Sequence, residues 1–310
     1  IGSCALDANT TGSSNTAVGR NSLGSNIDAV FNTAVGHNSL ATNSTGDNNT
    51  GIGYNALVSN TTADNNTGVG WGALFANTTG TGNVAVGKDA MDSNTTGSNN
   101  TALGLDALQN NSTASDNTAV GSNALFINTG CRNVAVGSCS LKANTTGTHN
   151  VASGFASLLV NTEGCKNVAS GYSALGSNTT GDENVAIGCG ALGGNITADG
   201  NTAVGSQALK ANTTGAENTA VGLCSLNANT TGSSNVALGR RALDANTEGS
   251  NNTAGGYNAL VFNTTGIDNA AFGSNALQAN TTGDNNVAVG RFSLKSNTTG
   301  GNNVAVGFEA

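Results

Sequence analysis

The chain has 310 residues and a net charge of −8; 9% of its residues are charged, 4% are aromatic and none is proline. Ten lysines and arginines are too few for the clustered basic surface that neutralises nucleic-acid phosphates, so we expect no nucleic-acid partner. Gly, Asn, Thr or Ser interrupts every apolar run well before the ~20 residues that a bilayer requires, so we expect no membrane insertion within this segment.

One short repeat makes up the whole chain. The string Asn-(Thr/Val)-Ala-Val-Gly begins at Asn15 and recurs every 17 residues up to Asn303, apart from one 16-residue interval between Asn117 and Asn133. We number the unit N-T/V-A-V-G-x-x-A/S-L-x-x-N-T-T-G-x-x as repeat positions 1 to 17. Asn at positions 1 and 12 and Gly at position 5 never vary, and position 9 is Leu except at Met91. Self-similarity at a fixed period indicates a repeat architecture.

The elements of each unit follow in chain order. Positions 2 to 4, as in residues 16–18 and 33–35, predict a short strand with period 2. Gly at position 5 predicts a bend with positive φ, and the apolar pair at positions 8 and 9 predicts a second short strand. These apolar stretches are too short for a helix. We therefore predict an all-β fold, a parallel β-solenoid (β-roll) of about 18 coils with 17 residues per coil.

Stacking of the coils about 4.8 Å apart predicts the contents of the core. Val at position 4 and Leu at position 9 would form buried columns, Asn at positions 1 and 12 would form side-chain amide ladders, and Ala at position 3 would present a flat outer face. One coil buries too little apolar surface to offset the ordering of its backbone. We therefore expect a homo-oligomer, favouring a trimer that packs on the Ala face, or an end-to-end filament.

Residues 1–310 are expected to form a single uninterrupted array. The repeat runs to both ends without a polar capping segment, which solenoids usually need. The array is therefore expected to be a segment of a longer fibre or a polymerising unit.

The strand sequence also resembles a known family. The coils Asn83-Val84-Ala85-Val86-Gly87 and Asn184-Val185-Ala186-Ile187-Gly188 resemble the V-A-I-G-x-x-A/S repeat of YadA-like trimeric autotransporter heads, and the full unit resembles repeats of phage tail-fibre proteins. The resemblance covers essentially the whole chain, although the YadA-like unit is shorter and lacks the N-T-T-G turn. It implies a trimeric left-handed β-roll that carries adhesion. The hypothesis is a non-enzymatic fibre or shaft module, located extracellularly, on a cell surface or on a virion surface.

The reactive side chains do not form a recurring pattern. His37 and His149 occupy different repeat positions in distant coils, and no Ser, Cys or carboxylate recurs at a catalytic spacing, so we expect no enzyme activity and no cofactor. Acidic residues such as Asp47 and Asp182 are scattered, which does not favour a calcium ladder or another metal site. The six cysteines are expected near the surface, and most are too far apart in coils for a disulfide within the chain.

Position 6 is the candidate contact site. It holds all three tyrosines and the only tryptophan, and the aromatic residues there are Tyr54, Trp71, Phe155, Tyr172, Tyr257 and Phe308. Exposed aromatic side chains concentrated in one column indicate contact with sugars or with a neighbouring fibre. A glycan-binding adhesin head is therefore one alternative function. The other interpretation is that position 6 tolerates any residue, since it also holds Ser122 and Ser206.

Asparagine-linked glycosylation is a further expectation. Position 12 often begins an Asn-Thr-Thr sequon, but it stays Asn where the sequon fails, as in Asn161-Thr162-Glu163, which indicates a structural role. The better candidates are position-17 residues that precede Asn-Thr, namely Asn48, Asn65, Asn99 and Asn251.

Ice binding is the alternative from a different functional class, because Thr-rich β-solenoids can present regular threonine columns. Position 13 is mostly Thr. Positions 13 and 14 are adjacent, however, and should point to opposite faces, whereas a flat two-column array needs Thr at alternating positions.

Overall fold

A computed structural model describes residues 2–310. Each repeat contributes one three-residue strand at positions 2 to 4, and neighbouring strands pair in parallel with equal repeat positions opposite each other, as in Thr50↔Thr67 and Ile52↔Val69. This confirms the predicted all-β parallel solenoid with about 17 residues per coil. A search of residues 2–310 finds no helix with the length and hydropathy of a bilayer span.

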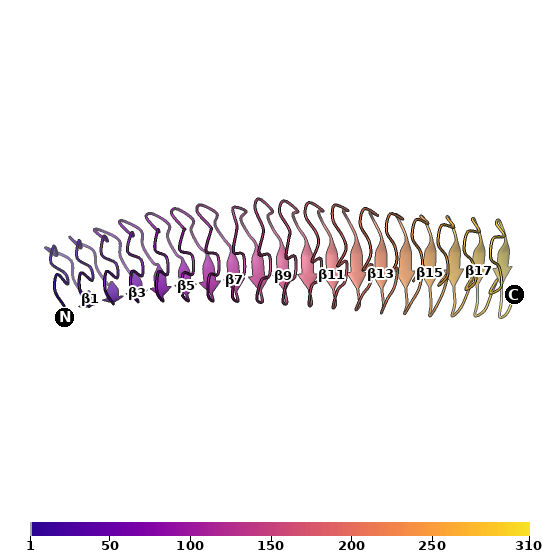
Figure 1. The fold of residues 1–310 in the computed structure, drawn as a ribbon, viewed down its shortest axis with the longest axis horizontal. Coiled ribbons are helices and arrows are strands. Elements are labelled where there is room, and N and C mark those ends of the chain that lie inside the picture. The colour runs from indigo at the N-terminus through magenta and orange to yellow at the C-terminus, as the bar shows by residue number, and fades with distance from the viewer. Residues whose placement is uncertain (1) are drawn as a thin grey trace. The chain divides into compact units, whose positions relative to one another are not determined.

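The chain divides into two compact units, one ending at Asn150 and the other comprising Val151–Ala310. Within each unit, successive coils lie side by side, with one strand in each coil (Figure 1). The strands of the first unit are β1 (Thr16–Val18), β2 (Thr33–Val35), β3 (Thr50–Ile52), β4 (Thr67–Val69), β5 (Val84–Val86), β6 (Thr101–Leu103), β7 (Thr118–Val120) and β8 (Val134–Val136). The strands of the second unit are β9 (Val151–Ser153), β10 (Val168–Ser170), β11 (Val185–Ile187), β12 (Thr202–Val204), β13 (Thr219–Val221), β14 (Val236–Leu238), β15 (Thr253–Gly255), β16 (Ala270–Phe272), β17 (Val287–Val289) and β18 (Val304–Val306).

The strands face the core with position 3, which reverses the predicted orientation. Ala85 is fully buried, whereas Val86 at position 4 is 37% exposed, and the same alternation recurs along both units. The prediction of a buried Val column and an outer Ala face was therefore wrong. The reason is space: a Cβ on Gly68, which occupies position 3, would lie 3.2 Å from Cγ of Leu57 in the preceding coil. The gap between strand and leucine column thus accommodates a methyl group and little more.

The leucine column at position 9 forms the apolar core, as predicted. Leu74, Met91 and Leu108 are fully buried on successive coils. The second strand predicted at positions 8 and 9 does not form, because positions 7 and 9 both adopt a left-handed conformation, as at Asn55 (φ 54°) and Leu57 (φ 53°). A leucine in this conformation costs about 1–2 kcal/mol, and full burial of its side chain, at about 1.5–3 kcal/mol, offsets that cost.

The predicted asparagine ladders form and lie next to each other, because Asn66 at position 1 and Asn77 at position 12 both donate to the Gly80 carbonyl. At position 12, Asn77 Nδ2 donates to Asn60 Oδ1 (2.9 Å) in the preceding coil and to the Gly80 carbonyl (3.0 Å) in its own turn. At position 1, the Asn83 backbone N–H donates to Asn66 Oδ1 (2.9 Å). Because buried amides must be hydrogen-bonded, and here their partners lie in the neighbouring coils, neither position tolerates another residue.

The bend glycines at position 5 have the predicted positive φ, between 126° and 151° in every coil. A Cβ at Gly222 would lie 2.6 Å from the carbonyl oxygen of Gly239 in the next coil. Glycine is therefore required both by the backbone conformation and by the close approach of the coils.

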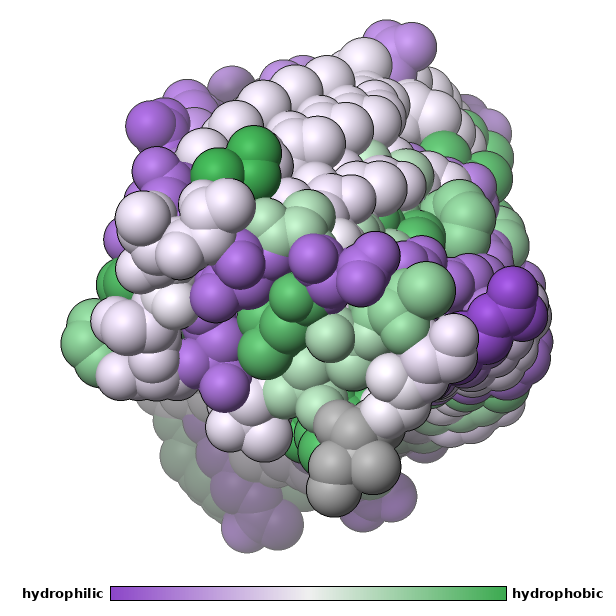
Figure 2. Space-filling model, turned by 90° about the vertical axis from the view of Figure 1, so that its left-hand side faces the viewer, coloured by the Kyte–Doolittle hydropathy of each residue, from purple (hydrophilic) through white to green (hydrophobic). Residues whose placement is uncertain are grey.

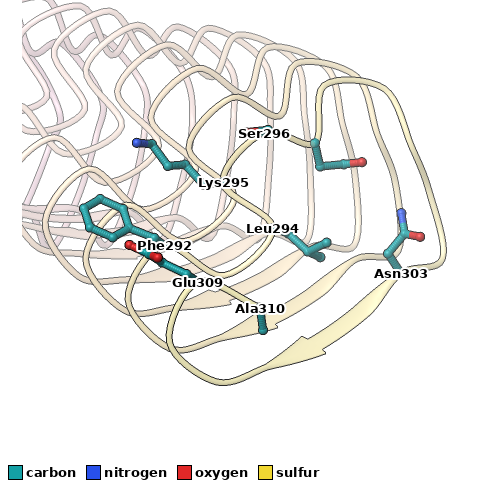
Figure 3. A pocket seen from close by; sticks show the side chains of 8 residues that line it. Phe292, Leu294, Lys295, Ser296, Asn303, Glu309 and Ala310 are labelled. Atoms are coloured by element: carbon teal, nitrogen blue, oxygen red, sulfur yellow. The ribbon is translucent and has the colours of Figure 1, made fainter.

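The coil cross-section is visible at the two ends of the described chain. Figure 2, which faces the N-terminal end, shows apolar residues in the middle of the end face and polar residues around them. In the last coil, Leu294 and Asn303 lie inside the loop of the chain (Figure 3), beside a hollow of about 560 Å³.

Candidate functional site

The position-6 column lies at the surface. Each residue directly follows a bend glycine, where the chain turns away from the strand. All six predicted contact residues are exposed, by 45% to 65%: Tyr54, Trp71, Phe155, Tyr172, Tyr257 and Phe308. Large aromatic side chains therefore project from the flank of both units.

In the first unit the rings stack along the column. The ring centroids of His37 and Tyr54 lie 5.3 Å apart and those of Tyr54 and Trp71 5.9 Å apart, with nearly parallel planes. Lys88 Nζ lies 5.1 Å from the centre of the Trp71 ring. Neighbours along the column thus contact the faces of Tyr54 and Trp71, and these rings offer mainly their edges to solvent.

In the second unit the aromatic residues form three separate groups. Phe155 stacks on Tyr172 at 5.6 Å, Arg240 lies 5.8 Å from the Tyr257 ring, and Phe308 meets Phe292 edge-on at 6.3 Å. The six predicted residues are therefore not one continuous stripe. After Tyr172 the next position-6 residue is Cys189, whose side chain is too small to cover a ring.

Sequence reasoning missed the cations of the same column. Arg20, Lys88, Arg240 and Arg291 all occupy position 6, which makes four of the ten lysines and arginines, and no acidic residue occurs there. Lys88 and Arg240 lie over aromatic rings of the preceding and following coils, respectively. Such contacts contribute about 0.5–1 kcal/mol at exposed sites. A tally of residue types by repeat position would have found them.

A surface hollow of about 270 Å³ lies beside the aromatic column in the first unit. Its walls include Trp71, Phe75, Asp89 and Asp92. Lys88 Nζ and Asp89 Oδ2 form an ion pair at 2.7 Å, and Asp89 Oδ1 is buried without a hydrogen-bond partner among the described residues. Burial, together with the neighbouring carboxylates of Asp89 and Asp106, raises the pKa of Asp92.

A larger hollow of about 580 Å³ lies in the second unit, beside Tyr172. Most repeats carry larger side chains at positions 10 and 11, such as Phe75 or Leu159, but this part of the chain has Gly193 and Gly194 there. Position 7 is also glycine, at Gly190. The hollow therefore arises where three positions of one coil have lost their side chains.

The asparagines separate into buried and exposed sets. Asn60 and Asn77 at position 12 are fully buried in the ladder, which confirms the predicted structural role, and a glycosyltransferase could not reach them in the folded coil. The predicted glycosylation candidates at position 17, which are all exposed, are Asn48, Asn65, Asn99 and Asn251.

The remaining reactive groups do not converge on one site. As expected, none of the six cysteines is buried. No disulfide joins them within residues 2–310. The described residues contain no cluster of three or more His, Cys, Asp or Glu side chains placed to hold a metal ion. The Lys166–Glu183 ion pair (2.8 Å) lies on the surface; it lowers the pKa of Glu183 and raises that of Lys166.

A scan against protein-family models finds no match, and a search of curated proteins finds none.

Proposed function

We propose that the chain is a non-enzymatic structural module, the fibre or shaft of an extracellular or virion-surface filament or adhesin. The proposal rests on one observation: the buried asparagines of successive coils are hydrogen-bonded to one another. Asn94 Nδ2, for example, donates to Asn77 Oδ1 at 2.8 Å, and this contact repeats from coil to coil. Such an array gains length without needing any new kind of contact, so its role is to extend and to present a surface.

The partner we propose is the chain itself, as a homo-oligomer, with a trimer favoured, or as an end-to-end filament. Positions 2 and 4 of the strands face outward, and apolar residues there, such as Val221, Leu238 and Phe272, are exposed. A long exposed apolar sheet face is a site at which another chain packs. This face replaces the Ala face expected from the sequence.

Electron microscopy and mass measurement test the proposal. Negatively stained particles are expected to be elongated, with a mass above that of one chain by light scattering. The double variant Val221→Lys, Leu238→Lys should lower that mass and keep the β circular dichroism, whereas the matched change Thr214→Lys on an exposed turn should alter neither. Compact particles of one chain would contradict the proposal.

Ice binding is the second candidate, and the outward strand face is the observation that favours it. Thr16, Thr33, Thr50 and Thr67 lie in register on β1 to β4, each beside an aliphatic residue at position 4. The position-13 threonines are less suited, because their hydroxyls donate to the next coil, as from Thr213 to the Thr230 carbonyl at 3.0 Å. Thermal hysteresis that is lost in Thr33→Lys, Thr50→Lys would support ice binding, and its absence from the parent protein would exclude it.

A further inference from the structure

We infer that the hollow beside Tyr172 binds a pyranose sugar that carries a carboxylate. The inference goes beyond the structural role proposed above, because it assigns a ligand site to one place on the array. The hollow measures about 580 Å³, which lies within the range of small-molecule sites. Such sites combine an apolar platform with a few polar groups, and both are present here.

Tyr172 supplies the platform. Phe155 stacks on one face of its ring at 5.6 Å and 12°, which fixes the orientation of the ring. On the opposite side the column continues with Cys189, which also lines the hollow. The ring is 60% exposed, so a face remains open for the C–H face of a pyranose, which is apolar. Trp71 also stacks on a neighbour and lines a hollow, but Lys88 Nζ lies 5.1 Å from the centre of its ring, whereas no cation lies over Tyr172 within residues 2–310.

Glycines provide the room for the ligand. A Cβ on Gly190 would meet no atom within 4 Å, so the space above it is open. The backbone there has φ 63°, and other coils carry asparagine at the same repeat position with nearly the same φ, as at Asn55 (54°) and Asn123 (55°). The fold therefore does not need glycine at this position. What the glycine provides is the empty space.

Polar groups on the far wall indicate the class of sugar. Gln207 and Lys210 line the hollow, and both are exposed. Lys210 is the one charged residue among those that line it, and it forms no salt bridge with any carboxylate of residues 2–310. A site whose single charge is positive favours an anionic ligand. The amide of Gln207 can hydrogen-bond the sugar hydroxyls.

Saturation-transfer NMR and titration of the intact chain with methyl β-glucuronide and the neutral methyl β-glucoside test the inference. We expect a dissociation constant of about 1 mM for the glucuronide and binding of the glucoside about 5- to 10-fold weaker. Tyr172→Ser should weaken both by about 10-fold or more, and Gly190→Asn should do the same by filling the hollow. Lys210→Gln should lower the affinity for the glucuronide to that for the glucoside.

Tyr257→Ser is the matched control, because it removes an aromatic residue of the same repeat position away from the hollow, and it should bind as the parent does. Binding that survives Tyr172→Ser, or a parent protein that shows no transfer from the glucuronide at about 10 mM, would overturn the inference. Equal affinity for the two sugars would overturn the role of Lys210. If either site variant unfolds, alkylation of the unmodified protein decides: the glucuronide should slow modification of Cys189 but not of Cys4, and equal rates would refute the site.

Discussion

Replacing one ladder asparagine should destabilise the array strongly, because its side chain is hydrogen-bonded to both neighbouring coils. Asn77→Ala removes the bonds from Nδ2 to Asn60 Oδ1 (2.9 Å) and to the Gly80 carbonyl (3.0 Å), and the bond that Oδ1 accepts from Asn94 (2.8 Å). At about 1 kcal/mol each, the three bonds sum to about 3 kcal/mol. The buried Asn60 Oδ1 keeps only a long contact with Asn66 (3.5 Å), which adds to the loss.

Urea denaturation followed by tryptophan fluorescence measures the effect directly, because the only tryptophan, Trp71, lies in the same coil as Asn77. With a denaturant slope of about 1–3 kcal/mol per molar urea, a loss of about 3 kcal/mol lowers the midpoint by about 1–3 M. Thr79→Ala is the control: it changes an exposed turn side chain two residues away, and its effect should stay within about 0.5 kcal/mol. Coincident midpoints for Asn77→Ala and Thr79→Ala would refute the ladder as a source of stability.

Three further predictions concern the leucine column, the bend glycines and the hollow that Asp89 and Asp92 line. Leu175→Asp places a carboxylate without a partner in the leucine column and should cost more than about 4 kcal/mol, so a melting temperature equal to the parent's would show that the column is exposed. Gly222→Ala should lower the melting temperature, because its Cβ would lie 2.6 Å from the Gly239 carbonyl oxygen; unchanged melting would contradict the close coil contact. Asp92→Asn should melt above the parent at pH 7 and level with it near pH 3, because the raised pKa of Asp92 means that the folded chain loses stability as the pH rises through that pKa. Equal melting at pH 7 would show that the Asp92 carboxylate is not disfavoured there.

Much of the fold follows from the repeat alone. Position 5 must be glycine and positions 1 and 12 must be asparagine, because a stack of identical coils places these groups against their own copies at the strand spacing. The leucine at position 9 follows from the same reasoning. These predictions were confirmed because they depend on stacking alone and not on the path of the chain within one coil.

The orientation of the strand could not be derived from hydrophobicity. A three-residue strand can bury either position 3 or positions 2 and 4. Hydrophobicity favours burial of the larger apolar residue, the Val at position 4. The structure selects Ala, because the leucine column lies too close for a larger side chain: a Cβ at Gly51 would lie 3.3 Å from Cγ of Leu40. A signal was present in the sequence, since position 3 holds only Ala or Gly, whereas position 4 also accepts Ser153, Gly255 and Phe272.

The turn at positions 7 to 9 was missed for a different reason. The apolar pair at positions 8 and 9 indicated a strand, but leucine at φ 53°, as at Leu57, is disfavoured locally and persists only because burial compensates for it. The frequent Asn and Asp at position 7, as at Asn55 and Asp106, were the available indication of a left-handed residue.

The candidate site was predicted only in part. The exposure of the position-6 aromatic residues follows from their place after the bend glycine. Which ring faces are covered depends on the neighbouring coils, since Lys88 lies over Trp71 whereas Cys189 leaves Tyr172 open. Gly190 and Gly193, which leave room for the hollow, depart visibly from the repeat. That they lie together beside Tyr172 could be seen only from the arrangement of the coils in space.

X-ray diffraction from aligned fibres of the protein tests most directly whether each 17-residue repeat forms one coil of a parallel stack. A parallel stack of coils predicts a strong reflection at about 4.8 Å along the fibre axis, because the strands of successive coils are spaced by that distance in the direction of stacking. A pattern without this axial reflection, or one dominated by the spacing of about 5.4 Å that a helix turn gives, would contradict it.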